Sequence, residues 1–67
     1  MPICYTIDRK TEKAYVFKSI KDLKETMIPL AIKTKKPFKV YELMGHGRVL
    51  GWIRPTLKGA ARFISEQ

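Results

Sequence analysis

The side chains that could perform acid–base or nucleophilic chemistry are few in this chain and far apart in the sequence. His46 is the one histidine, in a segment flanked by glycines, and Cys4 is the one cysteine. A nucleophile and its base must lie within hydrogen-bond reach of each other. A structural zinc site takes about four ligands, more than one His and one Cys supply. We therefore expect a protein that is not an enzyme and that uses no metal and no cofactor.

Positive charge, in contrast, is abundant and uneven. The formal net charge is +8, and residues 1–25 contribute little to it because their six basic side chains face four acidic ones. Residues 26–64 hold a single acid, Glu42, and eight basic residues: Lys33, Lys35, Lys36, Lys39, Arg48, Arg54, Lys58 and Arg62. This distribution is typical of a protein that binds a polyanion, although lysine also serves solubility alone.

Trp52 lies between Arg48 and Arg54 in the sequence. An indole on a basic sheet face can stack on unpaired bases, with Phe38 as a second ring, at ~1–3 kcal/mol per base. The candidate nucleic-acid-binding residues are therefore Lys33, Lys35, Lys36, Lys39, Arg48, Trp52, Arg54, Lys58 and Arg62. In the alternative, a C-terminal helix covers Trp52, and the basic residues contact phosphates without reading bases.

Two classes of function fit this chemistry. The first is a small non-enzymatic nucleic-acid-binding protein, with DNA or RNA as its partner. The second is a small protein-binding module, such as an inhibitor or adaptor of the phage or mobile-element type, that docks on an acidic surface of a larger partner through an edge strand. A homodimer that closes two sheets is a further outcome.

The sequence also indicates where in the cell the protein resides. A single unpaired cysteine fits a reducing cytosol. The chain has no apolar run near the ~20 residues that a membrane span needs, and its N-terminus lacks the basic and apolar regions of a signal peptide. We expect a cytoplasmic protein with no membrane partner.

The segment from Pro37 to Pro55 predicts the scaffold that positions these side chains. Two runs rich in β-branched and aromatic residues flank Gly45-His46-Gly47, which predicts a β-hairpin with a three-residue loop. That loop pairs Val40 with Trp52. One face, the better core candidate, then carries Tyr41, Leu43, Val49 and Ile53, with Gly51 under the Tyr41 ring. The other face carries Phe38, Val40, Trp52, Glu42, Arg48 and Arg54. A shift of one residue in the register would exchange the two faces.

A first hairpin is predicted over residues 3–18, with its turn through RKTE and Asp8 at the turn start. A turn centred on Lys10-Thr11 pairs Tyr5 with Val16 and Cys4 with Phe17. Both faces carry apolar groups, so either could be the core side. Cys4 in this apolar strand is expected to be a small buried hydrophobe.

Ser19 predicts a helix N-cap, with Asp22 in the first turn. Apolar residues then recur at helical spacing: Ile20, Leu23, Met27, Leu30 and Ala31. Pro29 removes a backbone bond and costs ~3 kcal/mol inside a helix. The helix therefore either stops near Met27 or kinks at Pro29 and resumes, and the continuing apolar register favours the kink.

Thr56 is predicted to cap a short C-terminal helix from Leu57 to about Ser65, with an apolar stripe of Leu57, Ala60, Ala61 and Ile64. Residues 51–59 resemble the strand-to-helix exit after the wing of winged-helix DNA-binding domains. The helix-turn-helix of that family is absent from the preceding sequence, so the family is not assigned. The predicted fold is one basic α+β domain over residues 1–67, in the order ββαββα. It has a four-stranded, mainly antiparallel sheet, one kinked helix on a face and a short C-terminal helix.

Overall fold

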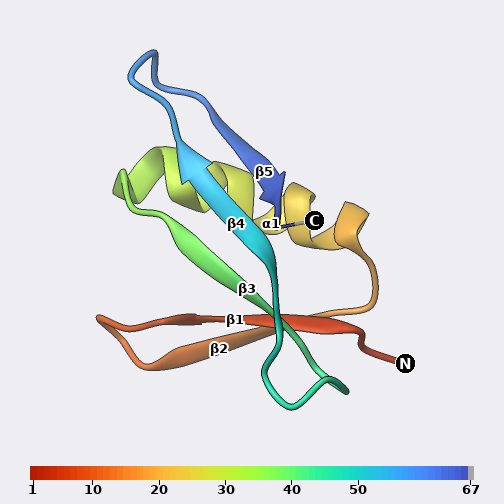
Figure 1. The fold of residues 1–67 in the computed structure, drawn as a ribbon. Helices are drawn as coiled ribbons and strands as arrows, with labels where there is room; N and C mark the ends of the chain where they lie inside the picture. The colour runs from red at the N-terminus through yellow and green to blue at the C-terminus, as the bar shows by residue number, and fades with distance from the viewer. Residues whose placement is uncertain (67) are drawn as a thin grey trace.

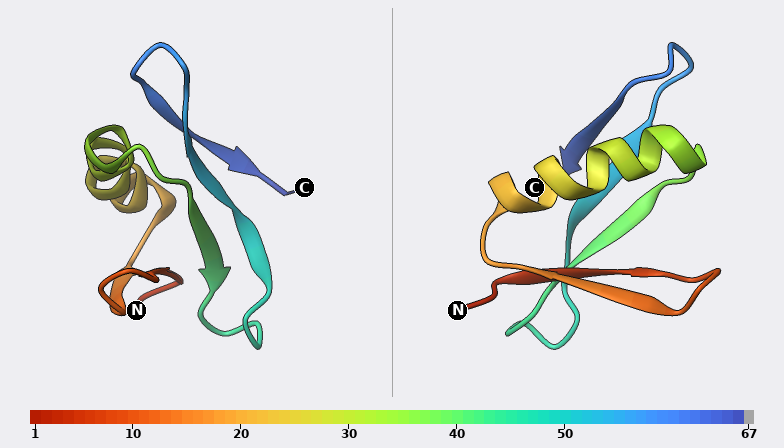
Figure 2. Two further views of the ribbon diagram at one scale, coloured as in Figure 1. Left: turned by 90° about the vertical axis from the view of Figure 1, so that its left-hand side faces the viewer. Right: turned by 180° about the vertical axis from the view of Figure 1, so that it is seen from behind.

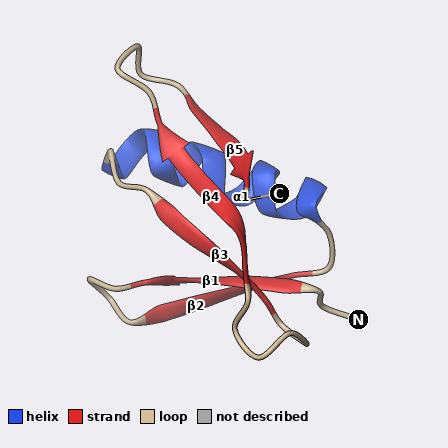
Figure 3. Ribbon diagram, viewed as in Figure 1, coloured by secondary structure: helices blue, strands red, loops and turns tan. Residues whose placement is uncertain are grey.

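A computed structural model describes residues 1–66 of the chain. It contains five strands and one helix within that range (Figure 1). They follow the order β1 (Cys4–Asp8), β2 (Lys13–Phe17), α1 (Ile20–Thr34), β3 (Phe38–Glu42), β4 (Val49–Pro55) and β5 (Ala61–Ser65). The α+β class is confirmed. The prediction of four strands and a second helix is wrong (Figure 3).

The five strands form one antiparallel sheet in the order β2-β1-β3-β4-β5. The sheet is strongly twisted, since β1 and β2 run across the lower part of Figure 1 while β4 rises up the page. Both side views place α1 on one face of the sheet only (Figure 2). No helix of residues 1–66 covers the opposite face, and this asymmetry decides which side chains are exposed on the sheet.

The first hairpin has the predicted register: Cys4 lies opposite Phe17, and Tyr5 opposite Val16. Asp8 acts as predicted at the turn, because its Oδ1 accepts a hydrogen bond from the backbone N–H of Lys10 at 3.0 Å. The structure shows which face of the first hairpin packs in the core, a point that the sequence alone did not decide. Cys4 and Phe17 point toward α1, and Tyr5 and Val16 lie on the other face.

Helix α1 begins as predicted and continues through Pro29 to Thr34. The Ser19 Oγ accepts a hydrogen bond from the backbone N–H of Asp22 at 3.1 Å. Pro29 is exposed, and so is Glu25, the residue whose carbonyl loses its partner, so the lost bond lies on the water side of the helix. The helix ends at Lys35, whose backbone is left-handed (φ 58°) and whose N–H donates to the Ala31 carbonyl at 2.8 Å.

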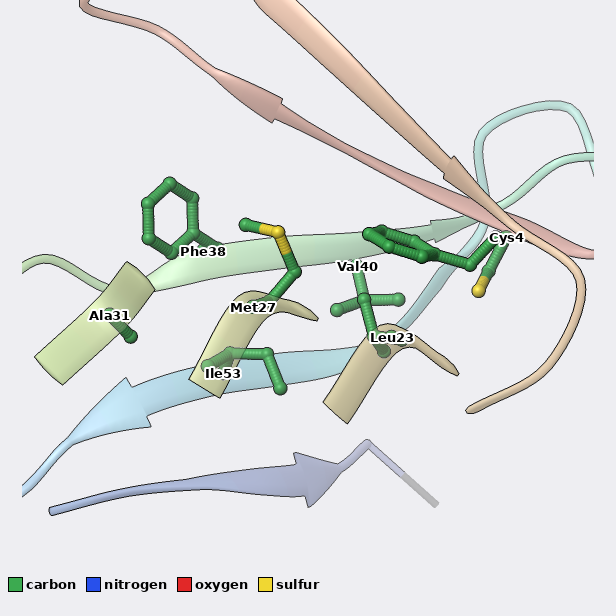
Figure 4. Close-up of a cluster of buried hydrophobic side chains, with 8 residues drawn as sticks. Cys4, Leu23, Met27, Ala31, Phe38, Val40 and Ile53 are labelled. Atoms are coloured by element: carbon green, nitrogen blue, oxygen red, sulfur yellow. The ribbon is translucent and has the colours of Figure 1, made fainter. Parts of the chain in front are cut away.

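The core lies between α1 and the sheet (Figure 4). Three helix residues, Leu23, Met27 and Ala31, are fully buried against it. The sheet contributes Cys4, Phe17, Phe38, Val40 and Ile53. Cys4 is confirmed as a buried hydrophobe with no exposed surface.

The predicted register of the central hairpin is wrong by one residue. Lys39, not Val40, lies opposite Trp52, and Val40 lies opposite Gly51. The loop is longer than predicted, since it spans residues 43–48, and the pairing shifts between Val40 and Tyr41. A shift of one residue exchanges the faces. Phe38 and Val40 of β3 therefore face α1 in the core, and Tyr41 lies on the uncovered face. Ile53 of β4 is buried in the core, as predicted.

The predicted C-terminal helix is wrong as well, because residues 61–65 form strand β5 and pair with β4. Thr56 caps a turn, not a helix. Its N–H donates to the Ala60 carbonyl, and its own carbonyl accepts from Gly59, whose backbone is left-handed (φ 81°). A three-residue hairpin loop with glycine in the left-handed position has this pattern. The similarity of residues 51–59 to a winged-helix exit therefore does not extend to the structure.

Glycine at position 51 lets β5 approach β4 closely. A Cβ there would clash with the Ile64 carbonyl oxygen and would lie 2.9 Å from the Phe63 ring. The aromatic ring over Gly51 is therefore Phe63 of β5, not Tyr41 as predicted.

Candidate functional site on the open sheet face

The face of the sheet that α1 leaves uncovered is called the open face. It is built by strand alternation, because every second residue of each strand points away from the helix. From the paired registers and the core residues, the open face consists of Tyr5, Ile7, Ala14, Val16, Lys39, Tyr41, Trp52, Arg54, Arg62 and Ile64. Its centre is aromatic and basic, and its sides are apolar.

Trp52 is flanked by two cations on this face. The Lys39 Nζ lies 5.6 Å from the centre of the Trp52 ring, and the Arg54 guanidinium carbon lies 4.5 Å from it. Lys39 also lies 5.8 Å from the centre of the Tyr41 ring. Cations within about 6 Å of a ring centre are attracted to its π face. The indole and the positive charges therefore occupy one continuous surface.

The backbone at Lys39 is anchored on the core side of the sheet. The Thr6 side chain is fully buried, and its Oγ1 donates a hydrogen bond to the Lys39 backbone carbonyl at 2.7 Å. This bond joins β1 to the start of β3 on the core side. It anchors the backbone from which the Lys39 side chain rises on the open face.

Tyr5 and Tyr41 lie opposite each other on β1 and β3 and form a second aromatic unit. Their ring centres are 5.1 Å apart and their planes differ by 18°, which is a stacked arrangement. The aromatic surface therefore crosses three neighbouring strands, from Tyr5 on β1 through Tyr41 on β3 to Trp52 on β4.

Arg54 and Arg62 are directly opposite each other on β4 and β5, and both are exposed. Like charges opposite each other on paired strands destabilise the pairing. An anion that contacts both guanidinium groups would relieve this repulsion, so the pair is suited to a phosphate.

One acid reaches the centre of the face. The indole N–H of Trp52 donates a hydrogen bond to the Glu66 Oε1 at 3.1 Å. The carboxylate lies at the edge of the ring and Arg54 over its face. Glu66 thus places a negative charge where an anionic ligand would lie.

The nine predicted site residues do not all gather on this face. Lys39, Trp52, Arg54 and Arg62 lie on it, and Lys36 borders a hollow at its side. Lys35 lines a separate hollow beside the β4–β5 turn, and Lys58 lies in that turn. Lys33 is exposed in the last turn of α1, and Arg48 is exposed in the β3–β4 loop, immediately before β4. Phe38, proposed as a second stacking ring, is in the core with 3% of its surface exposed.

Sequence reasoning missed four residues of the site. Tyr5 and Tyr41 join Trp52 only because β1 pairs with β3, an arrangement that hairpin patterns do not reveal. Arg9 and Lys10 are not among the predicted residues, because the six basic side chains of residues 1–25 face four acidic ones. In the structure they lie in the β1–β2 turn and line the hollow that Lys36 borders.

The groups with potential for catalysis or metal binding are not assembled into a site. Burial raises the pKa of the Cys4 thiol, which therefore stays protonated in the core. His46 is exposed in the β3–β4 loop. Within residues 1–66, no three His, Cys, Asp or Glu side chains come close enough together to hold a metal ion. The single helix of this range is too short and too polar to cross a membrane.

Comparison of the chain with protein-family models, with curated proteins and with solved structures found no match. The inference of function therefore depends on the chemistry of the open face.

Proposed function

We propose that this protein binds nucleic acid on the open face of its sheet, with bases stacked on the aromatic rings and phosphates on the basic side chains. The observation that carries this proposal is the position of Lys39, which lies within 6 Å of both the Tyr41 and the Trp52 ring centres. A nucleic acid presents a flat base and a phosphate at each nucleotide, and this surface carries aromatic rings with cations beside them.

The arginines extend the same chemistry across β4 and β5. The Arg54 guanidinium carbon lies 4.5 Å from the centre of the Trp52 ring, and Arg62 is opposite Arg54. Basic groups alone would serve any acidic partner. Rings on an uncovered sheet face add a reason to prefer nucleic acid, because stacking on aromatic side chains is the usual way in which proteins hold unpaired bases.

The test is titration of fluorescently labelled 12-nucleotide DNA and RNA strands at several salt concentrations. Each neutralised phosphate of a single strand contributes a slope of about −0.7 to the logarithm of affinity against the logarithm of salt. Contacts from Lys39, Arg54 and Arg62 therefore predict a slope of about −2 for either strand. Trp52 is the only tryptophan, so its emission should change on binding and report occupancy of the open face directly.

A matched pair of variants separates the open face from general positive charge. Arg54→Gln with Arg62→Gln removes two charges from the face. Lys21→Gln with Lys24→Gln removes two exposed charges from α1, on the other side of the sheet. We expect the first pair to weaken binding about tenfold and the second by less than threefold. Absence of binding at tens of micromolar protein in ~50 mM salt would refute the proposal. Equal losses in the two pairs would place binding elsewhere and favour a docking role on an acidic protein surface.

A further inference from the structure

A hollow of about 280 Å³ opens at the side of the open face, between the β1–β2 turn and the start of β3. In Figure 1 both segments lie at the left of the molecule. The residues that line it and enter the argument are Arg9, Lys10, Lys36, Lys39, Tyr41 and Trp52. The hollow is therefore continuous with the aromatic centre of the open face through Lys39, Tyr41 and Trp52.

Its two sides differ in chemistry. Tyr41 and Trp52 supply rings on the sheet side, with Lys39 between them. The two connecting segments supply further cations: Arg9 and Lys10 from the β1–β2 turn and Lys36 from the link between α1 and β3. Such a site matches a ligand that has a flat aromatic part and a neighbouring negative charge.

The backbone that carries these cations is held by identified contacts. Asp8 lines the hollow as its one acid, and its Oδ1 accepts from the Lys10 backbone N–H at 3.0 Å. That bond folds the turn, which accounts for a carboxylate in an otherwise positive site. On the other side, the left-handed Lys35 ends α1 and Pro37 restricts φ before β3 begins, so Lys36 lies between two restricted residues.

The size of the hollow limits what can enter. Small-molecule sites have volumes of ~300–1,000 Å³, and the volume of this hollow, about 280 Å³, is just below that range. A single nucleotide unit is of the right class, whereas a duplex cannot present a base to the rings without unpairing and unstacking it, which costs a few kcal/mol per base.

Building on the proposed function, we propose that this hollow holds one unpaired nucleotide of a single strand. Its base lies against Tyr41 and Trp52, and its flanking phosphates lie against Arg9, Lys10 and Lys36. The neighbouring nucleotides continue over the open face toward Arg54. The hollow therefore makes the protein selective for single strands over duplexes of the same sequence.

The experiment compares one 12-nucleotide strand, free and annealed to its complement, at a single salt concentration. The proteins are the parent chain, Arg9→Gln with Lys10→Gln, and the control Lys21→Gln with Lys24→Gln. We expect the parent chain to bind the free strand at least tenfold more tightly than the duplex. The Arg9 and Lys10 pair should lose about tenfold in affinity for the free strand and most of this preference, while the control pair loses less than threefold. Circular dichroism and urea unfolding verify that each variant is folded.

The outcomes distinguish the two proposals. Equally small losses in the two variant pairs would overturn the nucleotide site and leave base stacking on the open face intact. Equal affinity of the parent chain for strand and duplex would overturn the nucleotide site and base stacking together, because a duplex presents no unpaired base to the rings. No binding of either nucleic acid by the parent chain would refute both. Should Arg9→Gln with Lys10→Gln prove unfolded, Lys36→Gln supplies the same test from the other side of the hollow, with Lys21→Gln as its control.

Discussion

Arg54 lies over the indole of Trp52, with its guanidinium carbon 4.5 Å from the centre of the ring, two residues further along the same face of β4. Strand alternation brings the two side chains to one side of the sheet, where no helix of residues 1–66 covers them. The contact places a positive charge over a flat ring. This pair is the part of the molecule whose removal should affect binding most.

Trp52→Ala should weaken binding of a single strand about 5- to 150-fold, because it removes a stacking interaction of ~1–3 kcal/mol. Trp52 is half-buried on the open face and is not part of the core cluster, so the variant should remain folded. Titration of a labelled strand measures the first effect and urea unfolding the second. Trp52→Phe is the matched control, since it keeps a ring and should retain most of the affinity. Loss of folding in Trp52→Ala would mean that the indole belongs to the core.

Glu66→Gln should strengthen binding about two- to fivefold at low salt. The Glu66 Oε1 accepts a hydrogen bond from the Trp52 indole N–H, so its charge lies beside the surface where we place phosphates. Glutamine keeps a carbonyl acceptor for the indole and removes only the charge. The gain should fade as salt increases, because interactions between exposed charges are screened.

Glu25→Gln is the control for this change, as it removes one exposed negative charge from α1, on the other side of the sheet. It raises the net charge by the same amount and should change affinity by less than 1.5-fold. An equal gain in both variants would show that net charge alone governs binding.

The first half of the fold, from β1 to α1, follows from local signals in the sequence. The β1–β2 register depends on one turn, which Asp8 determines through a bond to its own neighbour. The start of α1 depends on Ser19 in the same way. Each of these elements is decided by contacts a few residues apart, so the sequence pattern was sufficient.

The remainder depends on contacts between distant residues. The central hairpin takes the register that buries Phe38 and Val40 under α1, and the β3–β4 loop and a shift at Val40 accommodate it. Residues 61–65 fit a helical stripe as well as a strand, and pairing with β4 decides between them. Pairing of β1 with β3, which is also long-range, places Tyr5 beside Tyr41. Alternation along one strand was enough to predict that Arg54 shares a face with Trp52, whereas the two tyrosines reach that face only through pairing of distant strands.

Gly59→Ala should destabilise the fold by about 1 kcal/mol. The sign of this change in stability distinguishes the observed hairpin from the predicted helix. In the predicted C-terminal helix, alanine would be about 1 kcal/mol more favourable than glycine. In the observed hairpin, Gly59 has a φ of 81°, which a residue with a Cβ adopts only with strain. A Cβ at this position would meet no atom within 4 Å, so the change in stability reports backbone conformation alone.

Gly59→Asn is the control, because asparagine tolerates the left-handed conformation at hairpin turns and should be nearly neutral. Urea unfolding of the three proteins measures the difference. Greater stability of Gly59→Ala than of the parent chain would contradict the β4–β5 hairpin and restore the helix.

The stability of the parent chain should fall above about pH 9 by an amount that depends on Cys4. Burial raises the pKa of this thiol above its ordinary value of 9.0, so the folded state keeps the proton at a pH where the unfolded chain has lost it. The unfolded state then binds fewer protons than the folded state, and the free energy of unfolding decreases as pH rises through this range. Below pH 9 the thiol is protonated in both states and contributes no slope.

Cys4→Ala isolates the contribution of the thiol from every other effect of pH on stability. The variant should be less stable at pH 7, by roughly 1 kcal/mol, because it leaves a small cavity in the core cluster to which Cys4 belongs. The difference in free energy of unfolding between the parent chain and the variant should shrink between pH 9 and pH 10.5, because only the parent chain loses stability through the ionisation of the thiol. Urea unfolding of both proteins at half-unit pH steps measures the gap. A gap that stays constant across this range would mean that the Cys4 thiol ionises as readily in the folded protein as in the unfolded chain.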